Sequence, residues 1–191
     1  MKTEQLVVNS PAVFHIVGYK NSGKTTLVCR LVERLRRRGY RVGTVKSDAH
    51  QFEMDHPGRD TWQHREAGAE VVAITSRTRT AILEEQPRTL SDLLAHMREM
   101  DIVLVEGMKA GSYPKVVLLR HEDDRALIDQ LERVIAVATW LPADTINAEW
   151  GSAEHVSSTP KVYHIDDVER IANLLVKAMG AEKDDILCDN E

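Results

Sequence analysis

The residue pattern with the clearest chemical meaning runs from Gly18 to Thr25 and reads Gly-Tyr-Lys-Asn-Ser-Gly-Lys-Thr. It matches G-x-x-x-x-G-K-[ST], the nucleotide phosphate loop. The glycines let the backbone curl so that successive N–H groups face inward, and the N-terminus of the following helix favours anions. Lys24 is expected to face the β- and γ-phosphates, and the Thr25 hydroxyl is expected to ligate Mg²⁺. The predicted nucleotide-binding residues are Gly18, Tyr19, Lys20, Asn21, Ser22, Gly23, Lys24, Thr25 and Thr26.

An acidic residue at the end of a buried strand usually accompanies such a loop. The segment Ile102–Val105 is apolar throughout, and Glu106 follows it. Open α/β sheets bind ligands at the carboxyl ends of their strands, which is where this carboxylate would emerge. Glu106 is therefore a candidate to bind Mg²⁺ directly or through water. Together with Lys24 it forms the candidate catalytic pair.

Titratable side chains gather in residues 46–60, a stretch with little periodicity that is typical of a long loop. Loops of this length are often functional, and in phosphate-loop proteins this region often responds to the γ-phosphate. Asp48, His50 and Asp55 could contact metal or water, and Asp48 is the third candidate Mg²⁺ ligand. A solvated loop without any ligand is an equally good interpretation. Zinc is disfavoured because no ligand spacing here matches an established zinc pattern.

The usual signals for base selection and rapid hydrolysis are missing from the sequence. GTPases commonly recognise guanine with an N-K-x-D segment, and none occurs here. The residues from Thr139 to Asp144, which follow the predicted strand Val134–Ala138, are the nearest place for base contacts. No evident water-orienting Gln and no assured Arg finger accompany the loop. We therefore expect intrinsic hydrolysis on the order of 10⁻³ per second or below.

Apolar strands alternate with amphipathic helices along the chain, which indicates βαβ units around a mainly parallel sheet. We predict an α/β fold, a phosphate-loop NTPase with one domain over residues 1–180 and a mostly parallel central sheet flanked by helices. Gly180 is expected to end the last helix, leaving residues 181–191 as an acidic, disordered tail. The two longest predicted helices begin at Lys24 and directly after Asp166. The predicted strands are 12–17, 41–46, 70–75, 79–83, 102–105, 115–119, 134–138 and 161–165.

Composition and charge exclude several classes of protein. The 191 residues are 42% hydrophobic and 29% charged, which is close to globular averages. No apolar run approaches the roughly 20 residues of a membrane-spanning helix. The net charge of −5 includes no basic excess that would favour nucleic acid. Two cysteines are too few for a disulfide framework, and the N-terminus lacks a signal-peptide pattern. We therefore expect a cytoplasmic protein without nucleic-acid or membrane partners.

Several segments together resemble one known family, the molybdopterin-guanine dinucleotide biosynthesis adapter proteins (MobB). These segments are GYKNSGKTTL, VKSDAH, DHPGRDTWQHREAGA, LVEGMK and PKVVLLR, in order between Phe14 and Thr139. The loop alone would be generic, but P-G-[KR]-D before R-x-A-G-A, and E-G-x-K before P-K-V, are specific. The resemblance implies a phosphate-loop protein that binds GTP with Mg²⁺, hydrolyses it slowly and forms homodimers. It also implies work beside the guanylyltransferase that joins GMP to molybdenum-bound molybdopterin.

The resemblance carries over by motif to individual residues. It implies that residues 18–26 form the nucleotide loop and that Glu106 is the acidic strand end. It adds Arg79, which matches a family Arg suitably placed for an anion. Ser47 departs from the frequent Lys-His pair of the family, so the role of that His is absent or taken by His50. The implied partners are the guanylyltransferase and the molybdopterin cofactor or an acceptor molybdoenzyme.

Two other functions would use the same loop and stay open at this point. A small-molecule kinase or ATP-dependent ligase normally adds an Arg-rich lid, whereas Arg77, Arg79 and Arg88 are dispersed. A metal-delivery GTPase for nickel enzymes relies on His-rich tracts or paired cysteines, whereas Cys29 and Cys188 lie far apart. The sequence and the resemblance together favour a GTP-binding adapter that is at most a slow GTPase.

Overall fold

The structure is a computed structural model that describes residues 10–48, 52–142 and 160–188. Its contacts divide the chain into two compact units. The larger unit combines the residues up to Ser47 with those from His96 onward, and the smaller unit spans Asp48–Ala95. The larger unit carries the central sheet, and we describe the two units separately.

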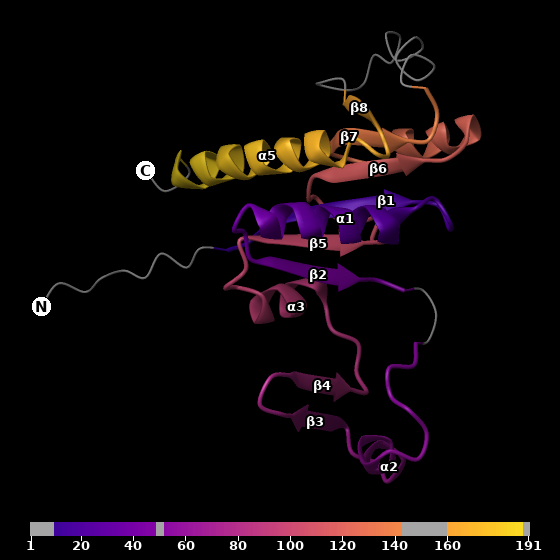
Figure 1. Ribbon diagram of the computed structural model, residues 1–191, viewed down its shortest axis with the longest axis vertical. Coiled ribbons are helices and arrows are strands. Elements are labelled where there is room, and N and C mark those ends of the chain that lie inside the picture. The colour runs from indigo at the N-terminus through magenta and orange to yellow at the C-terminus, as the bar shows by residue number, and fades with distance from the viewer. Residues whose placement is uncertain (1–9, 49–51, 143–159, 189–191) are drawn as a thin grey trace, which may run out of the picture. The chain divides into compact units, whose positions relative to one another are not determined.

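The central sheet has six strands in the order β2-β5-β1-β6-β7-β8, and every neighbouring pair is parallel (Figure 1). The central strands β1, β5 and β6 are buried along their whole length, which explains why their sequences are apolar without alternation. The predicted α/β fold with a mostly parallel sheet is thereby confirmed. The strands are β1 (Ala12–Gly18), β2 (Val42–Lys46), β5 (Ile102–Glu106), β6 (Lys115–Leu119), β7 (Val134–Thr139) and β8 (Lys161–His164).

Helices cover both faces of this sheet. The helices α1 (Lys24–Arg37) and α5 (Val168–Cys188) share one apolar core with β1, β5 and β6, and Figure 1 shows both lying over the sheet. On α1 this core contains Leu27, Leu31 and Leu35, the spacing of one helical face. The 3₁₀ segment η1 (Glu122–Gln130) covers the other face with Leu127 and Ile128.

The last helix is longer than its sequence indicates. We expected Gly180 to end α5, but the helix continues to Cys188, so this prediction is wrong. Glycine ends a helix when it adopts the left-handed conformation. Gly180 does not adopt a positive φ, so it costs only about 1 kcal/mol of helix propensity. The disorder expected for residues 181–191 stays a prediction.

The smaller unit contains an antiparallel hairpin between two short helices. Strands β3 (Val71–Thr75) and β4 (Thr80–Glu84) pair antiparallel, as predicted for a hairpin. The helices are α2 (Asp60–Glu66) before the hairpin and α3 (Leu90–His96) after it. Among the described residues, no helix has the length and apolar character needed to cross a bilayer.

Candidate functional site

The phosphate loop, residues 18–25, joins the buried strand β1 to the first turn of α1. Asn21 and Gly23 have φ angles of 62° and 99°, which are left-handed values that bend the chain sharply. A Cβ atom on Gly18 would lie 2.6 Å from Ser22 Oγ, so the loop closes tightly over its first residue. No side chain caps the N-terminus of α1. The helix N–H groups are therefore available to an anion.

Lys24 reaches back across the loop that precedes it. Its Nζ donates hydrogen bonds to the carbonyl oxygens of Tyr19 at 2.7 Å and Gly18 at 3.1 Å. Burial lowers the pKa of Lys24 from its ordinary value, and the positive charges of Lys109 and Lys46 lower this pKa further. Glu106 opposes this shift. A phosphate group bound here would stabilise the clustered lysines.

Glu106 contacts the same loop from the end of β5. Its Oε1 accepts a 2.7 Å hydrogen bond from the Thr25 hydroxyl, and only 7% of the residue is exposed. The parallel pairing of β5 with β1 sets Glu106 beside Ile16, two residues before the loop. A carboxylate and a hydroxyl at a phosphate-binding helix terminus form a set of hard oxygen donors that suits Mg²⁺. The donor set therefore fits this metal.

The segment after Glu106 supplies a cation that sequence reasoning missed. Gly107 has φ of 94°, and a Cβ there would lie 2.8 Å from the carbonyl oxygen of Ser47. The chain turns at this point, and Lys109 Nζ lies 4.6 Å from the centroid of the Tyr19 ring. The E-G-x-K spacing was the available signal for Lys109. It indicated family resemblance but no chemical role.

Two buried polar side chains anchor this segment to the sheet. His15 on β1 donates from Nδ1 to the carbonyl oxygen of Met108 at 2.9 Å. Lys115 on β6, its neighbour across the strands, donates from Nζ to the carbonyl oxygens of Gly111 and Tyr113 at 2.5 and 3.0 Å. Burial lowers the pKa of His15, and the charge of Lys115 adds to the effect. The two side chains bind the turn that carries Lys109.

Two side chains contact the loop from the ends of neighbouring strands. Trp140, next after β7, donates from Nε1 to the carbonyl oxygen of Ser22 at 3.0 Å. Arg120, next after β6, donates from Nη1 to the carbonyl oxygen of Asn21 at 2.8 Å. Residues 139–144 are the nearest place that the sequence offers for base contacts, and this placement stays a prediction. Within this segment Trp140 contacts the phosphate loop, and residues 143 and 144 lie outside the described residues.

The remaining predicted site residues fall into two groups. Lys20 and Thr26 are exposed on the loop and the first turn of α1. Asp48 and Arg79 belong to the smaller unit, so their roles toward metal and anion stay predictions. Asp55 Oδ1 accepts from the Thr61 hydroxyl at 3.1 Å and helps to shape the start of α2.

Metal binding by a cluster of side chains outside the loop finds no support in the described part of the chain. No group of three His, Cys, Asp or Glu residues there could hold a metal ion. His50, the alternative for the missing family His, lies outside the described residues. Its role, and the interpretation that disfavours zinc in residues 46–60, stay predictions.

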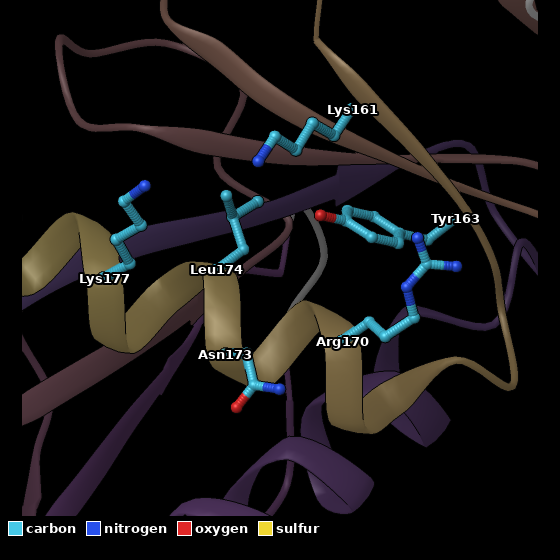
Figure 2. A pocket seen from close by; sticks show the side chains of 6 residues that line it. All are labelled: Lys161, Tyr163, Arg170, Asn173, Leu174 and Lys177. Carbon is cyan, nitrogen blue, oxygen red and sulfur yellow. The ribbon is translucent and has the colours of Figure 1, made fainter.

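Residues of β8 and α5 line a pocket of about 250 Å³, and Figure 2 shows their side chains. β8 is an edge strand of the sheet, and β6 and β7 separate it from β1. The Arg170 guanidinium lies 5.1 Å from the centre of the Tyr163 ring. Three of the side chains that line the pocket are cations and none is an acid, so the pocket would favour anions. The lining residues are Lys161, Tyr163, Arg170, Asn173, Leu174 and Lys177.

Comparison with known proteins points to one family. The family model described as molybdopterin guanine dinucleotide synthesis protein B matches residues 13–140. A molybdopterin-guanine dinucleotide biosynthesis adapter protein from Haemophilus influenzae is 39% identical over 140 residues, which cover 71% of this chain and 79% of that protein. Its counterpart from Escherichia coli K12 is 33% identical over 172 residues, covering 85% and 90%. The crystal structure of a MobB homolog from Bacillus stearothermophilus aligns with a TM-score of 0.65 at 31% identity, covering 88% of this chain and 98% of that one.

Proposed function

Because the chain belongs to the molybdopterin guanine dinucleotide synthesis protein B family, we propose that it is a GTP-binding adapter with slow GTPase activity. Its task is to assist a guanylyltransferase in molybdopterin guanine dinucleotide biosynthesis, the pathway that the names of its relatives give. The observation that carries the nucleotide part is the contact of Thr25 with Glu106 beside the uncapped N-terminus of α1.

The site residues have distinct tasks in this proposal. The backbone N–H groups of residues 18–26 bind the phosphates, and Lys24 adds a charge at the β- and γ-phosphates. Thr25 and Glu106 hold Mg²⁺, with Asp48 as a further ligand, and Arg79 contacts an anionic group. When bound, Mg²⁺ neutralises charge that develops on the phosphates. Lys24 and Glu106 are the residues on which turnover depends.

Slow turnover is part of the proposal. The loop supplies phosphate binding, but the sequence supplies no evident Gln to orient water and no assured Arg finger. Unassisted phosphate-loop GTPases hydrolyse GTP at roughly 10⁻⁴ to 10⁻² per second. We place this protein on the order of 10⁻³ per second or below. Such a rate suits a carrier or timer that acts on a partner.

We further propose that the protein forms homodimers. In the smaller unit, Val71, Ile74 and Ile82 on the hairpin are 56%, 54% and 57% exposed. Val71 and Ile82 lie on one face of the hairpin and Ile74 on the other, because Ile82 pairs with Ala73 and side chains alternate along a strand. A two-stranded hairpin is marginal by itself, and a second copy could cover the face that carries Val71 and Ile82. The other partners are the guanylyltransferase and the molybdopterin cofactor or its acceptor enzyme. We assign the protein to the cytoplasm, where a thiol such as the exposed Cys29 stays reduced.

Isothermal titration with Mg·GTP and Mg·ATP tests the nucleotide part. We expect tighter binding of GTP, and Lys24→Ala should weaken it at least about tenfold because a charged hydrogen bond contributes about 1.5–3 kcal/mol. Arg37→Ala removes an exposed cation from the end of α1 opposite the loop and should leave the affinity unchanged. Unchanged affinity in a folded Lys24→Ala protein would contradict the proposal that this loop binds the phosphates.

Reconstitution tests the adapter part. Adding the protein to guanylyltransferase, GTP, Mg²⁺ and a molybdopterin-loaded acceptor enzyme should raise acceptor activity above that obtained with the transferase alone. Rapid phosphorylation of a small molecule without any partner would favour the kinase alternative instead.

A further inference from the structure

A loop whose N–H groups converge on an anion must direct carbonyl oxygens away from that anion. In this protein two consecutive loop carbonyls accept hydrogen bonds from side chains outside the loop. Arg120 Nη1 donates to the Asn21 oxygen at 2.8 Å, and Trp140 Nε1 donates to the Ser22 oxygen at 3.0 Å. The phosphate loop is thus bound through its carbonyl groups by two residues outside it.

The sheet fixes where these two donors lie. Arg120 and Trp140 directly follow the neighbouring parallel strands β6 and β7. The backbone N–H of Trp140 donates to the Leu119 carbonyl at 3.3 Å, and the backbone N–H of Arg120 donates to Asp124 Oδ2 at 2.7 Å. The Arg120 guanidinium carbon lies 5.8 Å from the centre of the Trp140 ring. Trp140 is therefore held by β6 and Arg120 by Asp124 of η1, and the two side chains lie close to each other.

The contacted part of the loop is the part that most needs support. Asn21 is a non-glycine residue at a left-handed φ of 62°, and Gly23 has φ of 99°. Such residues persist when their surroundings hold them. The Trp140 ring lies against Gly23, where a Cβ would come within 3.2 Å of ring atom Cζ2. Residues 21, 22 and 23 are therefore all contacted from outside the loop.

We propose that Arg120 and Trp140 are positioning residues that keep the phosphate loop in its anion-binding conformation before any ligand arrives. This inference rests on the proposed function only in that the loop binds phosphate groups. A loop ordered in advance loses less conformational freedom on binding, so its affinity for phosphates rises. The effect does not depend on which base the ligand carries.

A different role for Trp140 makes a contrasting prediction. The residue is 44% exposed, and an aromatic ring beside a nucleotide site can stack on a base. A stacking role would affect GTP, whereas a role through the loop would affect every ligand that carries the phosphates. Pyrophosphate has no base, so it separates the two roles.

The test compares Trp140→Phe, which keeps a ring but removes its N–H donor, with Trp62→Phe in α2 as the matched control. We expect Trp140→Phe to weaken Mg·pyrophosphate and Mg·GTP by the same factor, about fivefold, as for the loss of one hydrogen bond. In the ligand-free protein, amide exchange in residues 19–25 should become several-fold faster. Trp62→Phe should change neither quantity. Unchanged loop exchange together with unchanged pyrophosphate affinity would overturn the proposal.

Arg120 gives a second variant, since its exposed side chain is not part of the apolar core. Arg120→Met should speed loop exchange and weaken pyrophosphate binding, and Arg120→Lys, which keeps a donor, should recover part of both. A loss confined to GTP in either Arg120→Met or Trp140→Phe would mean base contact and would contradict loop positioning.

Failure of the proposed function has its own signature. A wild-type protein that binds pyrophosphate but does not prefer GTP to ATP would refute GTP selectivity, and the pyrophosphate result would still decide loop positioning. If the wild-type protein binds neither pyrophosphate nor GTP, amide exchange of the loop in the ligand-free variants decides whether Arg120 and Trp140 position it.

Discussion

The energy of the hydrogen bond between Thr25 and Glu106 can be measured with nearly isosteric substitutions. Thr25→Val removes the hydroxyl while keeping the branched shape of the side chain. Glu106→Gln removes the carboxylate charge while keeping the length, and its amide oxygen can still accept a hydrogen bond. The two single variants and the double variant form a cycle that isolates the energy of this one contact.

The structure sets the size of the expected coupling. A hydrogen bond to a charged group contributes about 1.5–3 kcal/mol, and a neutral one about 0.5–1.5 kcal/mol. The Thr25–Glu106 distance of 2.7 Å and the 7% exposure of Glu106 favour a strong bond, whereas the exposure of Thr25 weakens it. The amide in the Glu106→Gln variant would retain the weaker, neutral bond. The coupling between the two changes should therefore be about 1 kcal/mol in the free energy of unfolding.

Urea unfolding of the four proteins, without nucleotide and with chelator present, measures this coupling. We expect each single variant to be less stable than the wild type, and the double variant to lose about 1 kcal/mol less than the sum of the two single losses. Losses that add to within about 0.3–0.5 kcal/mol would show that the contact contributes nothing, and our account of the site at the end of β5 would be wrong.

Three further predictions concern other parts of the chain. Amide exchange in residues 48–59 should slow more with a non-hydrolysable GTP analogue than with GDP, and equal protection would mean a loop insensitive to the γ-phosphate. The buried His15 has a pKa lowered from 6.5, so the unfolded chain takes up a proton that the folded chain resists. The free energy of unfolding should thus decrease as the pH is lowered from about 7.5 to about 5.5. In urea titrations, His15→Asn should make the free energy of unfolding depend less on pH. The same pH dependence in the wild type and the variant would exclude His15 as its source. Gly107→Ala should cost at least about 2 kcal/mol, because it adds a backbone clash to left-handed strain, whereas Gly39→Ala, with a φ of 89° and open space around it, should cost only about 1 kcal/mol. Similar losses in these two proteins would contradict the clash.

The main architecture could be predicted because local pattern and global fold agree. The apolar residues of the strand Ile102–Glu106 indicate that it is buried, and the glycines of the loop before α1 indicate a sharply bent backbone. The end of α5 could not be predicted, since a glycine can stop a helix or continue it, depending on its backbone conformation. The division of the chain at residues 48–95 has no linker composition that would mark it.

The site was only partly predictable for a different reason. Lys24 belongs to the phosphate loop and Glu106 to the end of an apolar strand. Both could be recognised because the residues that define these motifs are their neighbours in the sequence. Lys109, Arg120 and Trp140 reach the loop only because β5, β6 and β7 lie near β1 in the sheet. No spacing along the chain encodes such contacts, which depend on strand order.

That strand order also determines when the site can first exist during synthesis. The strand β1, which begins at Ala12, pairs with no strand that follows it closely; its two neighbours start at Ile102 and Lys115. Chains fold as they emerge from the ribosome, and distant pairings form late. The loop leaves the ribosome before either of these strands, and both strands beside β1 are complete only after Leu119 has been synthesised. A nucleotide in the cell therefore meets a competent loop only on a nascent chain that already extends beyond Leu119.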